Sequence, residues 1–110
     1  MFTGAAAVFK GPVNYAYGYA MSKAATHNLA LQLAERKEIP KTATVVTILP
    51  QILDTPENRE MMKDADQSGW QPPEKVAELV RGWAEGENRP ENGSFAQLNY
   101  ENGCIIPEFL

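Results

Sequence analysis

The chain has 110 residues, of which 44% are hydrophobic and 22% are charged, and its net charge is −4. This length fits one domain, and the composition excludes an intrinsically disordered segment, which has fewer apolar residues and more charge. The lysines and arginines are scattered, so no basic patch is available to neutralise a nucleic-acid backbone. Residues 11–22, the longest stretch without a charged residue, contain Pro, Asn, Tyr and Gly and cannot span a bilayer.

The cysteine content and the first residues bear on the cellular compartment. Cys104 is the only cysteine, so it can form neither an internal disulfide nor a metal-binding cluster, which is typical of a reducing compartment. Residues 1–8 lack the basic start and the long apolar stretch of a signal peptide. We therefore expect a cytoplasmic protein without a membrane or nucleic-acid partner and without a metal site.

The first predicted elements are a short strand and a long helix. Residues 1–8 are apolar and end near a Gly-Pro pair, which indicates a buried strand. The very small residues 4–7 suggest that something approaches the backbone closely there, either a packed helix or a ligand. Residues 14–36 are rich in Ala and Leu and predict a helix that ends before Pro40. Its apolar surface is wider than one stripe, which is typical of a helix packed against two partners.

The middle of the chain predicts a buried strand and a long loop. Residues 44–49 are β-branched and almost continuously apolar, which is typical of a strand buried on both faces, and Pro50 ends it. The polar stretch 51–70, with a short helix around 57–63, is longer than a simple connection requires. We therefore expect a functional loop after this strand.

The last third of the chain predicts a helix, a strand and a hairpin. Prolines at 72–73 open an amphipathic helix that Gly86 can close. Its apolar residues follow helical spacing and are Val76, Leu79, Val80 and Trp83. Apolar and polar side chains alternate along residues 94–100, as in a strand, and an Asn-Gly turn leads into a short strand at 104–106. This order predicts an α/β fold with right-handed crossovers on a mainly parallel sheet.

Tyr19 and Lys23 are the residues with the clearest chemical potential. Four residues apart on a helix, they share a face, and an ammonium beside a phenol favours the phenolate and lowers a pKa that starts at ~10. A phenol tuned in this way can donate or accept a proton at cellular pH. By itself the pair fits a solvated contact on a helix surface equally well, because this spacing often arises by chance.

The pair belongs to a set of motifs that follow one another along the chain. Tyr19-Ala-Met-Ser-Lys23, at the start of an Ala-rich helix, resembles the active-site helix of the short-chain dehydrogenases/reductases. Residues 50–56, Pro-Gln-Ile-Leu-Asp-Thr-Pro, resemble the nicotinamide loop of that family. Within the family the chain is most similar to the dihydropteridine reductases, on the motifs at 17–23, 49–59, 88–90 and 93–94.

Two departures from the family pattern limit what the resemblance implies. Ala6 stands where the family usually has a catalytic Ser. The dihydropteridine reductases resemble this sequence in also having no Ser there, so the departure favours a pterin substrate. No Gly-rich pyrophosphate motif occurs in the sequence, so nothing in it can cradle a pyrophosphate at a helix N-terminus. The resemblance therefore implies the C-terminal half of a Rossmann-like, doubly wound parallel sheet over residues 1–110. We expect three main strands, two main helices and a short C-terminal hairpin.

The resemblance also implies a role for each matching residue. Tyr19 would donate a proton and contact the cofactor, and Lys23 would bind the nicotinamide ribose and lower the pKa of the Tyr19 phenol. The nicotinamide itself would be held, partly through backbone groups, by Pro50, Ile52, Leu53 and Thr55. The implied reaction is hydride transfer from NADH, or alternatively NADPH, to quinonoid dihydropterin, which regenerates the tetrahydropterin. The helix at 14–36 would pack against its counterpart in a homodimer.

Two alternatives stay open at this stage. One is another short-chain reductase that acts on a small carbonyl or imine, and Ala6 argues against it. The other is a truncated, non-catalytic form that acts only by dimerisation through the helix at 14–36. Without the preceding strands of the family, one strand edge would also be left unpaired and open to association. The resemblance thus implies an oxidoreductase family, and the activity of the isolated chain is a separate hypothesis.

Overall fold

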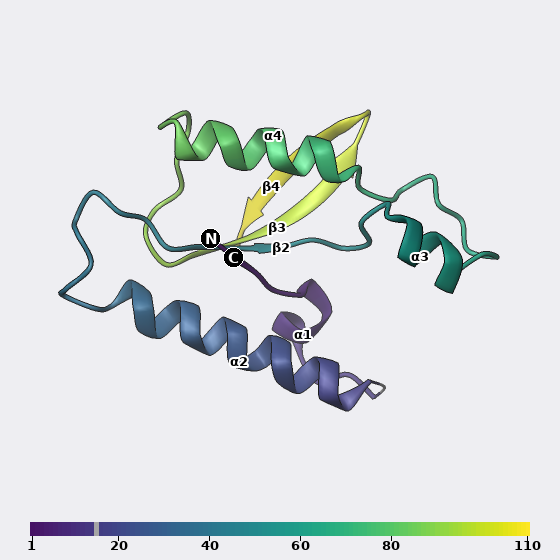
Figure 1. Cartoon of the computed structure of the whole chain (residues 1–110), viewed down its shortest axis with the longest axis horizontal. Coiled ribbons are helices and arrows are strands. Elements are labelled where there is room, and N and C mark those ends of the chain that lie inside the picture. Colours follow the sequence, from purple (N-terminus) through teal and green to yellow (C-terminus); the bar gives the residue numbers. More distant parts are fainter. Residues whose placement is uncertain (15) are drawn as a thin grey trace.

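A four-stranded sheet forms the centre of the computed structural model, which describes residues 1–14 and 16–110. In chain order, and in order across the sheet, its strands are β1 (Phe2–Thr3), β2 (Val46–Leu49), β3 (Ser94–Glu101) and β4 (Cys104–Phe109). The first three run parallel, and β4 pairs antiparallel with β3 (Figure 1). The predicted α/β fold with a mainly parallel sheet is confirmed, and it is compatible with part of a Rossmann-like fold.

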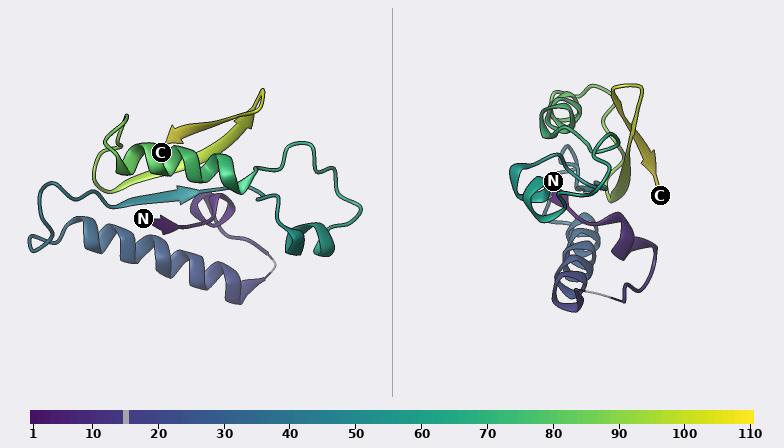
Figure 2. Two further views of the ribbon diagram at one scale, coloured as in Figure 1. Left: turned by 45° about the horizontal axis from the view of Figure 1, so that its top comes forward. Right: turned by 90° about the vertical axis from the view of Figure 1, so that its right-hand side faces the viewer.

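Helices cover both faces of this sheet. They are α1 (Ala6–Lys10), α2 (Tyr17–Ala34), α3 (Pro56–Met61) and α4 (Pro73–Ala84). Figures 1 and 2 show α2 and α4 on opposite sides of the sheet. The strand β2 is therefore buried along its whole length, as its continuously apolar sequence predicts. Within the described ranges, no helix is both long enough and apolar enough to cross a membrane.

Apolar clusters on the two faces hold the helices to the sheet. The cluster beneath α4 consists of Val46, Ile48, Val76, Trp83, Ala96 and Leu98. The cluster beneath α1 and α2 consists of Ala6, Ala30, Leu49 and Phe95. All of the residues in the predicted stripe of α4 lie in the first cluster or against it, so that prediction is confirmed. The helix has Pro73 in its first turn and ends before Gly86, whose φ of 92° suits glycine.

The predicted strand over residues 1–8 is wrong beyond Thr3, because the chain leaves the sheet at Gly4 and continues as α1. A Cβ atom on Gly4 would lie 2.3 Å from Nε2 of His27 and 2.8 Å from Cδ2 of Leu49. The helix α2 and the strand β2 therefore close on the backbone at this point, and the predicted close approach is confirmed. The alanines that follow have a high helix propensity, which explains the turn into α1.

The helix α2 lies inside the predicted range 14–36, and Tyr15, which that range includes, lies outside the described residues. One side of the helix packs on the sheet through the buried residues His27 and Ala30. Leu29 and Leu31 are 50% and 48% exposed. Both side chains are open to solvent, and no second packing partner covers them in the described part of the chain.

The remaining elements differ from their predictions only in length. The short helix expected around 57–63 is present as α3. The last strand was predicted at 104–106 and continues to Phe109 through Pro107, which stands opposite Leu98. Because β4 is an edge strand, a proline that cannot donate to a neighbouring strand is tolerated there.

Candidate active site

The predicted site residues come from the start of α2 and from the segment after β2. Because β1 and β2 are parallel, their carboxyl ends at Thr3 and Leu49 meet at one edge of the sheet. The Gly4 N–H donates to the Ile48 carbonyl at 2.8 Å and fixes this register. Figure 1 shows the start of α2 and the short helix α3 at the same end of the molecule. Ligands of open parallel sheets bind at the carboxyl ends of the strands, so this edge is the candidate active site.

Lys23 connects α2 to the end of β1. Its ammonium nitrogen donates to the Thr3 carbonyl at 3.0 Å and lies 5.8 Å from the centroid of the Tyr19 ring. Tyr19 is 54% exposed, so a molecule at this edge can reach its phenol. The structure therefore brings the predicted pair together in cation–π geometry, with the lysine oriented by the backbone of β1.

His27 makes a second connection between α2 and the chain after β1, one turn beyond Lys23. Its Nε2 accepts the Ala5 N–H at 3.1 Å, and its ring lies edge-on to Phe9 and Phe95. Burial and, to a smaller extent, the charge of Lys23 lower the pKa of the imidazole. His27 is therefore neutral at pH 7, with its proton assigned to Nδ1 because Nε2 is the acceptor. It packs in the core and holds the end of β1 against α2.

The loop after β2 is held by Gln71, a residue that sequence reasoning missed. The main chain of Gln71 pairs with the loop as a parallel bridge: its N–H donates to the Ile52 carbonyl and its carbonyl accepts the Asp54 N–H, both at 2.8 Å. Its side chain is 1% exposed, accepts the Gln51 N–H at 3.3 Å and donates to the Leu98 carbonyl at 2.6 Å. Glutamine is mostly an exposed residue type, so the sequence carries no local signal for this role.

The residues predicted to hold a nicotinamide differ in which polar groups they can offer. Pro50, directly after β2, is buried and has no N–H. The N–H groups of Ile52 and Leu53 donate to no acceptor in the described part of the chain, so they can donate to a ligand. The Thr55 hydroxyl oxygen accepts the Asn58 N–H at 3.2 Å as the N-cap of α3, which leaves its O–H as a donor.

An ion pair stands beside this loop. The Arg59 guanidinium donates to both carboxylate oxygens of Asp54, at 2.5 Å and 2.8 Å. The hydrogen bond from Arg59 lowers the pKa of the Asp54 carboxyl. Asp54 therefore stays ionised at neutral pH and is already paired, which favours a role in fixing the loop over a role in proton transfer.

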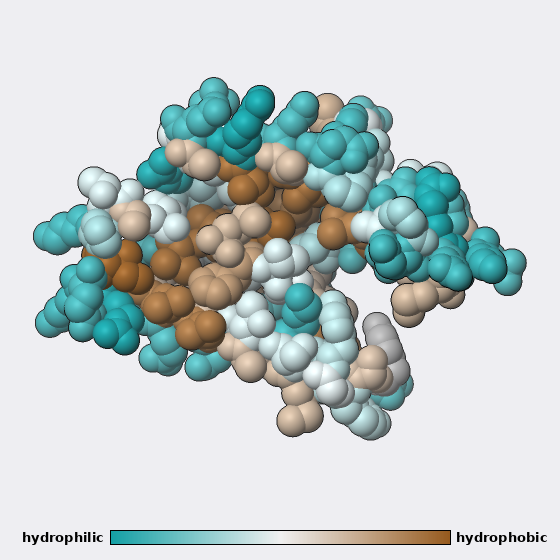
Figure 3. Space-filling model, viewed as in Figure 1, coloured by the Kyte–Doolittle hydropathy of each residue, from teal (hydrophilic) through white to brown (hydrophobic). Residues whose placement is uncertain are grey.

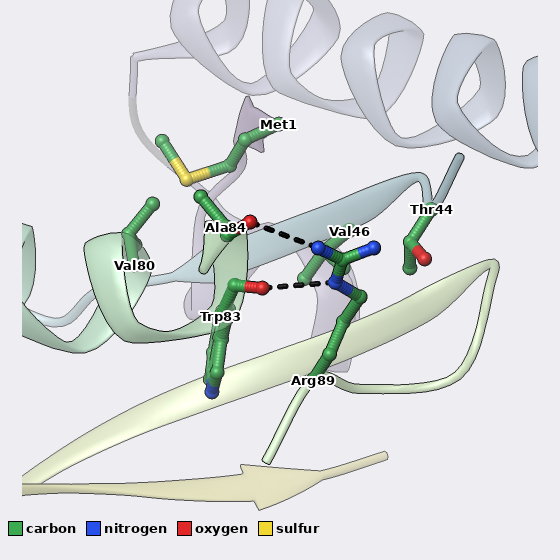
Figure 4. A pocket seen from close by; sticks show the side chains of 7 residues that line it. All are labelled: Met1, Thr44, Val46, Val80, Trp83, Ala84 and Arg89. Carbon is green, nitrogen blue, oxygen red and sulfur yellow. Dashed lines mark hydrogen bonds between the residues drawn. The ribbon is translucent and has the colours of Figure 1, made fainter. Parts of the chain in front are cut away.

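An apolar cavity lies at the opposite end of the strands. It has a volume of about 270 Å³ and is lined by Met1, Thr44, Val46, Val80, Trp83, Ala84 and Arg89. Figure 4 shows the Arg89 guanidinium turned toward the end of α4, where it donates to the carbonyls of Trp83 and Ala84, each at 2.9 Å. Figure 3 shows apolar side chains gathered between α4 and α2 on this face. The cavity contains none of the predicted site residues, so it is not the candidate active site.

The chemistry available at the candidate site is that of organic donors and acceptors. Among the described residues, no group of three or more His, Cys, Asp or Glu side chains could hold a metal ion. The site edge instead presents a phenol, an ammonium group, a hydroxyl and the N–H groups of the loop. Such a set can bind an amide and a diol and can move one proton.

Comparisons with known proteins bear on this interpretation. No family model matches the chain. A curated dihydropteridine reductase from Dictyostelium discoideum is 42% identical to it over 82 residues, which cover 73% of this chain. The matched segment spans 36% of the length of that relative. The resemblance predicted from Tyr19, Lys23 and residues 50–56 is therefore confirmed.

Proposed function

Because this chain is a homologue of a dihydropteridine reductase, we propose that it carries the proton-donating and nicotinamide-binding part of a pterin reductase. The reaction is the reduction of quinonoid dihydropterin to tetrahydropterin by NADH or, alternatively, NADPH. The main support is the position of Lys23, which the Thr3 carbonyl holds against the Tyr19 ring at the carboxyl edge of the sheet. The chain spans about a third of its relative, so the activity of a whole reductase is part of the proposal.

The polar groups of this edge fit a nicotinamide riboside. When bound, the nicotinamide supplies a hydride to the substrate. The N–H groups of Ile52 and Leu53 can donate to the carboxamide oxygen. The Thr55 hydroxyl oxygen accepts one bond from the Asn58 N–H and has a second lone pair for the carboxamide nitrogen. The Lys23 ammonium has three N–H donors and uses one on Thr3, so others remain for the ribose hydroxyls. Pro50 would contribute an apolar wall beside the ring.

Tyr19 supplies the proton that must accompany the hydride. Its phenol is exposed at the edge of the sheet and can donate its O–H to a ring nitrogen of the pterin. The Lys23 ammonium lies 5.8 Å from the centroid of the Tyr19 ring, and the phenolate left by the transfer regains a proton from water. Ala6 is buried at the start of α1 and offers no second hydroxyl, so Tyr19 acts as the proton donor without that help.

We also propose that the chain forms a homodimer through α2. Leu29 and Leu31 lie two positions apart, and so on different sides of this helix, and both leave apolar surface open to solvent. Packing two copies of the helix against each other would bury part of this surface and supply the second partner that the apolar width of the helix predicts.

The direct test is NADH oxidation with quinonoid dihydropterin by the wild-type chain and by Tyr19→Phe. Removing the phenolic proton should lower turnover by about 10²-fold or more. Tyr17→Phe is the matched control, because Tyr17 lies in the same helical turn and is also exposed. Turnover that survives in Tyr19→Phe at the level of Tyr17→Phe would refute the role of Tyr19. A folded, dimeric wild-type chain without turnover would instead favour the non-catalytic alternative.

A further inference from the structure

Gln71 makes hydrogen bonds through both its main chain and its side chain to the loop after β2 and to β3. Within the described residues it is one of the few buried polar side chains, and both its main chain and its side chain bind the loop that follows β2. On its other side, its amide nitrogen donates to the Leu98 carbonyl on β3. Gln71 therefore attaches the main chain of the loop to the sheet, alongside the bond from the Gln51 side chain to Asn99 on β3 at 3.2 Å.

The direction of these bonds determines which loop groups are left for a ligand. In the parallel bridge between Leu53 and Gln71, the Gln71 N–H donates to the Ile52 carbonyl and the Gln71 carbonyl accepts the Asp54 N–H. The N–H and carbonyl of Leu53 itself must then point away from Gln71, since they alternate along an extended segment. The Leu53 carbonyl accepts from Asn58 at 2.8 Å and from the Thr55 N–H at 3.0 Å, so its N–H is the group left available.

We propose that Gln71 is a positioning residue that presets the nicotinamide loop, a role that rests on the function proposed above. Its buried amide fixes Gln51 and thereby the entry of the loop, while its main chain fixes Ile52 and Asp54. The Leu53 N–H is held outward at the sheet edge before any ligand arrives. Such preorganisation reduces the ordering cost of binding. Gln71 acts through the loop and contacts no substrate.

The wild-type chain provides the first test by amide hydrogen exchange. The Gln51 and Asp54 amides, which donate to Gln71, should exchange more slowly than the Leu53 amide by about tenfold or more. Equal exchange rates at these amides would overturn the proposal, because the loop would then be free of Gln71 in solution. This measurement requires neither a variant nor a ligand.

The second test compares Gln71→Met with Gln97→Met. Methionine keeps the length and approximate volume of the side chain and removes its amide. Gln97 is the matched control, since it is also a buried glutamine of this sheet and bonds to no main-chain group of the loop. Its amide donates to the Asn99 side-chain oxygen, which also accepts from the Gln51 side chain, so any effect passed on through Asn99 is measured by this control. Exchange at Gln51 should rise about tenfold in Gln71→Met only, since that variant removes its acceptor.

Ligand binding is measured in the same samples with reduced nicotinamide mononucleotide, which contains only the part of the cofactor that this edge would contact. The dissociation constant should rise about tenfold in Gln71→Met and stay within twofold in Gln97→Met. Unchanged affinity in Gln71→Met despite faster loop exchange would overturn the positioning role while leaving the proposed function intact. A wild-type chain that does not bind the mononucleotide would refute the proposed nicotinamide site, and this inference with it.

Discussion

Replacing Gly4 with alanine tests whether the close contact between the end of β1 and α2 holds the site edge together. The added Cβ would lie 2.3 Å from Nε2 and 2.6 Å from Cδ2 of His27. The ring cannot simply turn away, because it is buried between aromatic neighbours and accepts the Ala5 N–H. Cδ2 of Leu49, at 2.8 Å, blocks the other direction. The backbone must therefore move away from α2.

The expected cost combines overpacking with a lost hydrogen bond. Forcing an extra methyl group into a packed core costs about 1–3 kcal/mol, and losing the bond between Ala5 and His27 costs about 1 kcal/mol more. Gly4→Ala should therefore lower the free energy of unfolding by about 2–4 kcal/mol. Urea denaturation followed by far-UV circular dichroism measures this change directly. The same displacement should move the Thr3 carbonyl away from Lys23 and loosen the Tyr19 pair.

Gly18→Ala is the control for this prediction. Gly18 lies in the first turn of α2, and a Cβ there would meet no atom within 4 Å. Alanine at this position should leave stability unchanged or raise it by up to about 1 kcal/mol, since it has the higher helix propensity. If the free energy of unfolding of Gly4→Ala lies within about 0.5 kcal/mol of the wild-type value, the reasoning from the His27 contact is refuted, because substitutions at unconstrained positions usually change it by no more than that.

Three further predictions concern pH, capping and assembly. Burial and the charge of Lys23 lower the pKa of His27, the only histidine in the sequence. As the pH falls below 6.5, the unfolded chain therefore binds a proton more readily than the folded chain, and stability is lost. Equal urea midpoints at pH 7.5 and 5.0 would contradict this. Thr55→Ala should destabilise α3 by about 1 kcal/mol and fray its first turn in NMR chemical shifts, because the bond to the Asn58 N–H is lost. Leu31→Glu should weaken the proposed dimer at least about tenfold in sedimentation velocity, because a carboxylate would be buried unpaired. Met61→Glu, a change at an exposed residue of α3, should leave the dimer intact, and equal effects of both variants would exclude α2 as the interface.

The sequence by itself determined the elements that depend on local pattern. Helical spacing of apolar residues predicted α4, and a continuously apolar, β-branched run predicted that β2 is buried on both faces. The spacing of Tyr19 and Lys23 placed both side chains on one helical face, because a helix of 3.6 residues per turn brings positions four apart together. These features follow from the chain within a few residues of each position.

Tertiary structure alone decided where β1 ends and what holds the site edge. Residues 1–8 read as a strand, yet His27, which is distant in sequence, closes on Gly4 and ends the pairing after Thr3. Gln71 likewise gains its role from Gln51 and Leu98, which lie on other elements. The spacing of apolar residues in the sequence predicts which face of a helix or strand a residue occupies, and it does not predict which other residues that residue contacts. The contacts that orient Lys23 and the loop after β2 join segments brought together only by packing of the sheet and its helices.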